Sequence, residues 1–232
     1  AQKRLTSKGA TIAAIVIAVL GLTGTIFTPP GGSTAAWWPA AGAAALFALL
    51  NPPRRRGAVV LLVLVVTVIP NLIHGRSLAV AVGYALGNAA EIAAMLAVLA
   101  IWGYRGSNPF VLRRTREALV LVVASLTGAV VAAVIAAATA ALLGGGDFPE
   151  TVFSVFPSHA AAILLFAPFA CIPPSSGPTP VPRWEAVLQP ALLFGVLAFV
   201  AFPRVEIPLT FLPFMIIAWG CQIGRASCRE RV

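Results

Sequence analysis

Long apolar runs separated by short polar breaks dominate the chain. Eight runs are apolar enough to form helices that cross a membrane, and they cover about 9–28, 34–50, 57–73, 78–102, 118–143, 157–172, 186–202 and 208–222. A membrane-spanning helix needs about 20 mainly apolar residues, so the second run and the last two are short. The breaks contain Pro and Gly, and none is long enough for a soluble domain. This pattern predicts an all-α fold, a polytopic integral membrane helical bundle with about eight spans.

The composition supports lipid as the solvent of this bundle. Apolar residues make up 59% of the chain and charged residues 10%, with a mean hydropathy of +0.95. Soluble domains have roughly 45–50% apolar and 25% charged residues. The first run has no small-residue cleavage site at its end, so it indicates a membrane helix and not a cleaved signal peptide.

The net charge of +9 reflects topology, because the basic residues cluster between the apolar runs. On alternate sides of the predicted spans, one side carries eleven basic residues and the other carries two, Arg76 and Arg204. This positive-inside bias predicts a multi-pass protein with a cytoplasmic N-terminus. A nucleic-acid partner is not expected, since no basic stripe with interleaved aromatics is present. His74 and Arg76 occupy a short outer turn, where we expect them to be solvated.

Glu91 is the one acidic residue in the middle of an apolar run. An ionised carboxylate there costs about 2.5–3.5 kcal/mol on insertion scales, so its side chain should face other helices or a wet cavity. Asn88 and Gly87 precede it by three and four residues and share its helical face. Gly83 and Gly87 form a small-xxx-small pair that allows a neighbouring helix to approach closely. Two interpretations stay open, a sensing or proton site and a structural hydrogen bond.

The remaining candidates are weaker. His159 is expected at the start of the sixth run, on the outer side, as an interfacial hydrogen-bonding residue or a pH-sensitive group. Trp37 and Trp38 are expected in the aromatic belt, with the lining of a ligand cavity as the alternative. A stripe of small residues along the fifth run indicates close packing: Ala124, Gly128, Ala132, Ala136 and Ala140. No pattern predicts a catalytic, cofactor or metal site, and the three Cys show no metal-type spacing.

Four short segments follow one another along the chain in a recognisable order. They are Trp37-Trp38-Pro39-Ala40-Ala41-Gly42, Gly87-Asn88-Ala89-Ala90-Glu91, Phe166-Ala167-Pro168-Phe169 and Leu212-Pro213-Phe214 through Trp219. Their order and spacing resemble the first membrane-associated sensor (MASE) domain family over nearly the whole chain. The chain departs from the family at Ile223-Gly224, where an Arg-Phe-Gly turn would follow.

The resemblance implies a function that composition does not show. In that family the membrane module is the sensory front end of bacterial signalling proteins, followed by a histidine kinase, a diguanylate cyclase or a phosphatase. It implies that residues 1–222 are a non-enzymatic sensor module in a bacterial plasma (inner) membrane, homo-oligomeric through the signalling parent. Glu91, Asn88, Trp37 and Trp38 would lie near the responsive cavity, and the small-molecule ligand stays open. Two-component or cyclic-di-GMP signalling would be the output.

Two other membrane functions compete with the sensor. A small-solute transporter should show internal repeats or paired broken helices, and no clear repeat relates the two halves of the chain. A membrane transferase should gather several polar residues at one interface, and the polar residues here are scattered.

The last ten residues, 223–232, change character abruptly. They read Ile-Gly-Arg-Ala-Ser-Cys-Arg-Glu-Arg-Val and carry four charges. The same ten residues result from translating the complement of a common sequencing-library adapter, so we expect the segment to be foreign to the natural protein. The alternative is a genuine basic tail on the cytoplasmic side. In the first case a cytoplasmic output domain would follow the membrane module.

Overall fold

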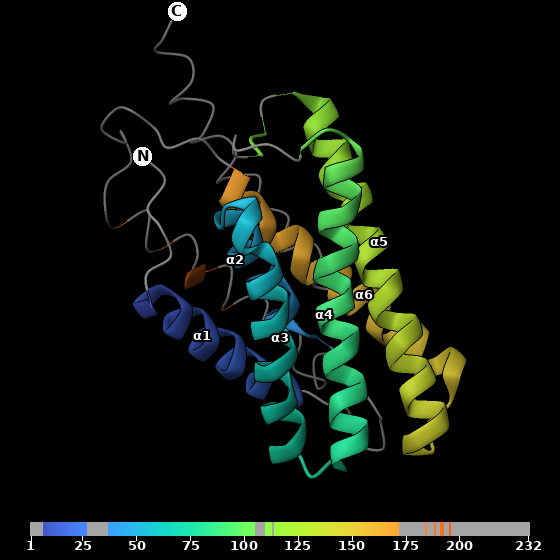
Figure 1. The fold of residues 1–232 in the computed structure, drawn as a ribbon. Coiled ribbons are helices and arrows are strands. Elements are labelled where there is room, and N and C mark those ends of the chain that lie inside the picture. The colour runs from blue at the N-terminus through green and yellow to red at the C-terminus, as the bar shows by residue number, and fades with distance from the viewer. Residues whose placement is uncertain are drawn as a thin grey trace, which may run out of the picture. The chain divides into compact units, whose positions relative to one another are not determined.

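The computed structural model describes residues 7–26, 37–104, 110–112 and 114–171, and five separate positions further on, 184, 188, 191, 192 and 195. Within these residues all regular structure is helical (Figure 1). The helices are α1 (Ser7–Ile26), α2 (Pro39–Leu50), α3 (Pro53–Ile73), α4 (Leu78–Ile101), α5 (Thr115–Thr139), the short π-helix η1 (Ala140–Gly144) and α6 (Phe148–Cys171). They belong to one compact unit, 1–173, and the five positions in the second unit, 174–232, are also helical. The predicted all-α class is confirmed for this part of the chain.

Four helical segments are long and apolar enough to cross a membrane. They are Pro53–Ile73, Leu78–Ile101, Thr115–Gly144 and Phe148–Cys171, whereas Gly9–Thr25 and Pro39–Leu50 are shorter apolar helices. At 1.5 Å per residue, the 24 residues of α4 extend about 36 Å, which is long enough to cross a hydrocarbon core about 30 Å thick. The structure therefore supports a membrane protein but not the count of about eight spans. The predicted runs 186–202 and 208–222 lie outside the described residues, apart from four helical positions in the first of them.

The sixth predicted run is longer than its pattern indicated. Helix α6 begins at Phe148, well before the predicted start at 157, and continues through Pro157 and Pro168. Its first turn is capped by Asp147, whose carboxylate accepts a hydrogen bond of 2.9 Å from the backbone N–H of Glu150. Helices in lipid tolerate internal proline because the freed backbone groups find partners in neighbouring helices. The predicted start at residue 157 was wrong, and His159 lies in the middle of the helix.

The contacts among the helices of the first unit close into a ring, in which α3, α4 and α5 lie side by side (Figure 1). Helix α1 contacts α2 and α3, α4 contacts α3 and α5, and α6 contacts α5 and α2. The short helix α2 also contacts α3 and α4, and nine of its twelve residues are buried. Its small side chains let neighbouring helices approach closely. At Gly42 the approach is so close that a Cβ would collide with the backbone carbonyl of Ala162 in α6. The run predicted as a second span is thus a short central helix.

The predicted small-residue seam lies between α4 and α5. All five residues of the α5–η1 stripe, from Ala124 to Ala140, are buried. A Cβ on Gly83 would collide with the side chain of Thr139, and one on Gly128 would lie 2.9 Å from the carbonyl oxygen of Glu91. The close-packing interpretation of these residues is confirmed. At Gly128 the seam packs α5 directly against Glu91 of α4.

The outer surface of the ring is apolar. On α3, Leu61, Val65, Ile69 and Ile73 recur every four residues and are all exposed. Large continuous apolar surfaces are disfavoured in water, whereas a lipid surround covers them without cost. The exposed stripe agrees with the four membrane-length helices.

Candidate functional site

Glu91 and His159 form a buried pair inside the ring. Glu91 has no exposed surface, and Nδ1 of His159 lies 3.0 and 2.9 Å from its two carboxylate oxygens. These distances place one proton between them, donated either by Nδ1–H to a carboxylate or by a carboxylic acid to Nδ1. Helices α4 and α6 are not neighbours in the ring, so the pair bridges its interior. The predicted inward orientation of Glu91 is confirmed.

Trp38 and Asn88 extend the pair to a third helix. The indole Nε1–H of Trp38, which immediately precedes α2, donates a hydrogen bond of 3.0 Å to Oδ1 of Asn88. The Asn88 amide in turn donates to the backbone carbonyl of Tyr84, also at 3.0 Å. The rings of Trp38 and His159 are nearly parallel, at 10°, with centroids 6.4 Å apart. We call Trp38, Asn88, Glu91 and His159 the polar cluster.

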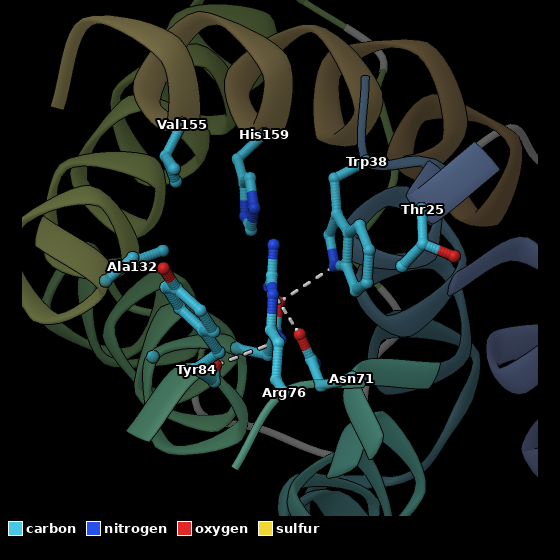
Figure 2. A pocket seen from close by; sticks show the side chains of 11 residues that line it. Thr25, Trp38, Asn71, Arg76, Tyr84, Ala132, Val155 and His159 are labelled. Atoms are coloured by element: carbon cyan, nitrogen blue, oxygen red, sulfur yellow. Dashed lines mark hydrogen bonds between the residues drawn. The ribbon is translucent and has the colours of Figure 1, made fainter. Parts of the chain in front are cut away.

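A small cavity, which we call the inner cavity, lies against the polar cluster. Its volume is about 40 Å³, and its polar lining comes from Trp38, Asn71, Arg76, Tyr84, Asn88 and His159 together with Thr25. A cavity of this size and polarity can hold ordered water, which needs roughly 10–15 Å³ and two to four polar partners. Figure 2 shows Arg76 and His159 approaching this inner cavity from opposite ends, with Trp38 and Tyr84 on its two sides.

Arg76 comes from the turn between α3 and α4. Its Nη1 donates a hydrogen bond of 2.6 Å to Oδ1 of Asn71, and its guanidinium lies 4.5 Å from the centre of the Tyr84 ring. Burial lowers the pKa of Arg76, and the nearby Tyr84 opposes part of this shift. An arginine with a lowered pKa still carries its charge at neutral pH. The site therefore holds a fixed positive charge beside a buried acid–imidazole pair.

The structure brings together some of the predicted site residues and separates others. Asn88, Glu91, Trp38 and His159 meet, and Gly87 lines the inner cavity beside them. Pro39 opens α2. Gly42 and Gly83 serve close helix contacts, and Trp37 is half-buried but is not among the described residues that line the cavity.

Two of these predictions were wrong in part. His159 was expected as a lone interfacial residue, but it is 8% exposed and paired with Glu91. Trp38 was expected in the aromatic belt, with the lining of a ligand cavity as the alternative. It is 7% exposed, bonds Asn88 and lines the cavity, which agrees with the alternative. In both cases the hydrogen-bond partner lies fifty or more positions away in the sequence, so the local pattern gave no indication of it.

Arg76, Asn71 and Tyr84 were missed as site residues. Arg76 was expected to be solvated in its turn, but it is half-buried and lines the cavity. A signal was present in the sequence, because Arg76 is one of only two basic residues on the side that the predicted topology leaves poor in charge. A basic residue retained against that bias is a candidate for function.

The described residues do not gather a metal-binding group of three or more His, Cys, Asp or Glu. The arrangement instead can hold and exchange a proton and can order water. Comparison of the chain with protein-family models, with curated proteins and with solved structures finds no match. A functional assignment therefore depends on the geometry of the polar cluster and on the motif resemblance.

Proposed function

We propose that this chain is a non-enzymatic sensor module of a bacterial signalling protein, with the polar cluster as its responsive element. The Glu91–His159 pair is the observation that carries the proposal. With Trp38, the pair joins the start of α2 to α4 and α6, so one change of protonation or hydration acts on three helices. A stimulus that favours one of two helix arrangements would then alter the position of the chain's cytoplasmic end.

The cost of the buried pair supports a functional interpretation. Two ionisable groups in a membrane interior are expensive to bury, and well-packed apolar residues often replace such a pair at no loss of stability. Intramembrane ionisable residues therefore commonly belong to functional sites. In this chain the pair also adjoins a polar cavity, which gives water or a proton access to it.

The topology that accompanies this proposal follows the basic-residue bias. The N-terminus would be cytoplasmic, in a plasma membrane, and the α3–α4 turn and the Gly144–Gly146 segment would face outward. The last two predicted spans would complete a multi-pass module, and an output domain of the kind found in the MASE family would follow it. Oligomerisation would occur through that signalling parent.

Transport of a small solute is the alternative. Within the described residues, helices α1 to α6 do not show the paired broken helices that transporters place at the membrane midplane. This observation favours the sensor.

The test uses the natural full-length protein that contains this module, in native membranes. Its kinase, cyclase or phosphatase activity is measured for the wild type, Glu91→Gln and His159→Gln. Ser125→Ala serves as a control, because Ser125 is buried but bonds only its own helix at Leu121 in the described contacts. The proposal predicts altered output in both cluster variants and unchanged output in the control. Unaltered output in both, or solute accumulation in proteoliposomes that Glu91→Gln abolishes, would reject the sensor and favour the transporter.

A further inference from the structure

A second and larger cavity lies beside the α3–α4 turn. It measures about 350 Å³, and we call it the outer pocket. Its polar lining comes from His74, Arg76, Ser77 and Tyr84, and its apolar lining includes Val80, Ala140 and Leu143. This volume falls in the range of small-molecule sites, which typically combine apolar walls with a few polar groups. The polar cluster contributes no residue to the described lining of the outer pocket.

Arg76 and Tyr84 connect the outer pocket to the inner cavity, because both residues line both spaces. The guanidinium of Arg76 lies over the Tyr84 ring, so these two side chains form the boundary between the spaces. A ligand in the outer pocket would therefore contact the same arginine that Figure 2 shows opposite His159.

One wall of the outer pocket is a π-helix. Ala140, Leu143 and Gly144 belong to η1, which ends at Gly145 in the left-handed conformation, with φ of +69°. The backbone N–H of Gly146 closes the turn by donating a 3.0 Å hydrogen bond to the carbonyl of Ala140. π-helical turns are rare and occur frequently at functional sites. This wall is an observation independent of Arg76 that also indicates a binding site.

The chemistry of the lining selects the ligand. Among the described residues of the outer pocket, Arg76 alone carries a permanent charge, and its planar fork of donors matches a carboxylate. His74 and Ser77 lie on either side of the Gly75-Arg76 pair and add polar groups next to it. The apolar wall from α4 and η1 gives an aliphatic chain a surface that a simple inorganic ion would not use.

We propose that the outer pocket binds a small organic acid, with its carboxylate on Arg76 and its aliphatic part against Val80, Ala140 and Leu143. A carboxylate at this position competes with Oδ1 of Asn71 for the Arg76 donors. Ligand binding then changes one boundary of the inner cavity next to His159. The transmission of that change to an output domain rests on the proposed sensor function, whereas the binding itself does not.

The test measures binding to the full chain in nanodiscs of uncharged phosphatidylcholine by ligand-observed NMR. The probes are acetate, butanoate and the uncharged butyramide. Butanoate should bind about tenfold more tightly than acetate, because two further CH₂ groups are buried. Butyramide should show no binding in the same concentration range. Arg76→Gln should weaken butanoate binding at least tenfold, whereas the exposed control Arg54→Gln should not change it.

A second variant protects the test against misfolding of Arg76→Gln. Leu143 is 57% exposed, so Leu143→Trp narrows the outer pocket without disturbing the packed interior, and it should also weaken butanoate binding. Equal binding of butanoate and butyramide, or full binding by Leu143→Trp, would overturn the proposal. Equally strong competition by chloride or inorganic phosphate would show a simple anion site and would also overturn it.

Anionic lipid headgroups could also bind Arg76, so a separate measurement tests them. If butanoate binds in phosphatidylcholine but anionic phosphatidylglycerol displaces it completely, the occupant is a headgroup and the organic-acid proposal fails. The outcome is separable from that of the sensor function. Butanoate binding together with unaltered output in both Glu91→Gln and His159→Gln would keep this site and reject the sensor. Altered output in both variants without butanoate binding would keep the sensor and reject this site.

Discussion

Replacing His159 by leucine removes the partner that both carboxylate oxygens of Glu91 contact at 3.0 and 2.9 Å. Glu91 has no exposed surface, so the substitution leaves its carboxyl group buried without a side-chain partner. Breaking a buried ion pair from one side costs about 3–5 kcal/mol, and we expect His159→Leu to lower the free energy of unfolding by that amount.

A double-mutant cycle separates the pair from the packing around it. Glu91→Leu alone leaves the His159 ring with an unsatisfied buried nitrogen, at about 1–3 kcal/mol. The double variant replaces the pair by apolar residues and should lie within about 2 kcal/mol of the wild type, so the coupling energy should reach about 3 kcal/mol. Unfolding of the purified chain in bicelles, monitored by helical circular dichroism, measures all four stabilities. Additive single losses, with a coupling energy below about 0.5 kcal/mol, would refute the pairing.

Further substitutions test the helix packing and the proposed topology. Gly42→Leu should destabilise the fold by about 1–3 kcal/mol through overpacking against α6, whereas the open Gly57→Ala should be neutral or stabilising, as equilibrium unfolding would show. Trp38→Phe should cost about 1–3 kcal/mol in the same assay because it leaves Oδ1 of Asn88 without its indole donor, and no loss would contradict that bond. A cysteine introduced in the segment 103–117, with native Cys removed, should resist an impermeant reagent in intact cells, and rapid labelling would reverse the proposed topology.

The helical class and the inward face of α4 could be predicted from the sequence because both depend on local spacing. Two local facts were enough to predict that Glu91 faces other helices: the cost of inserting a carboxylate into lipid and the Gly83–Gly87 spacing. The role of His159 could not be predicted in this way, since Glu91 lies 68 positions from it and no periodicity connects α4 to α6.

Two local rules gave wrong boundaries for physical reasons. Proline is common in the first turn of a helix, and this rule led to the prediction that the sixth run starts at Pro157. A helix surrounded by other helices and lipid tolerates an internal proline, and α6 continues through Pro157. The run at 34–50 is apolar enough to suggest a span, yet the helix α2 has only 12 residues, about 18 Å, and is buried by its neighbours. Apolar composition does not distinguish burial in protein from burial in lipid.

If the polar cluster is the responsive element, it sets the position of α6 relative to α4 across the interior of the ring. Spin labels at Val82 on α4 and Phe153 on α6, both exposed, report this position in nanodiscs of the full chain with native Cys removed. Pulsed electron–electron double resonance then gives the distance distribution between the two labels for the wild type, Glu91→Gln and the control Ser125→Ala. Glu91→Gln should shift the distribution to a second population that the control lacks, and superimposable distributions for all three proteins would contradict the proposed role of the polar cluster.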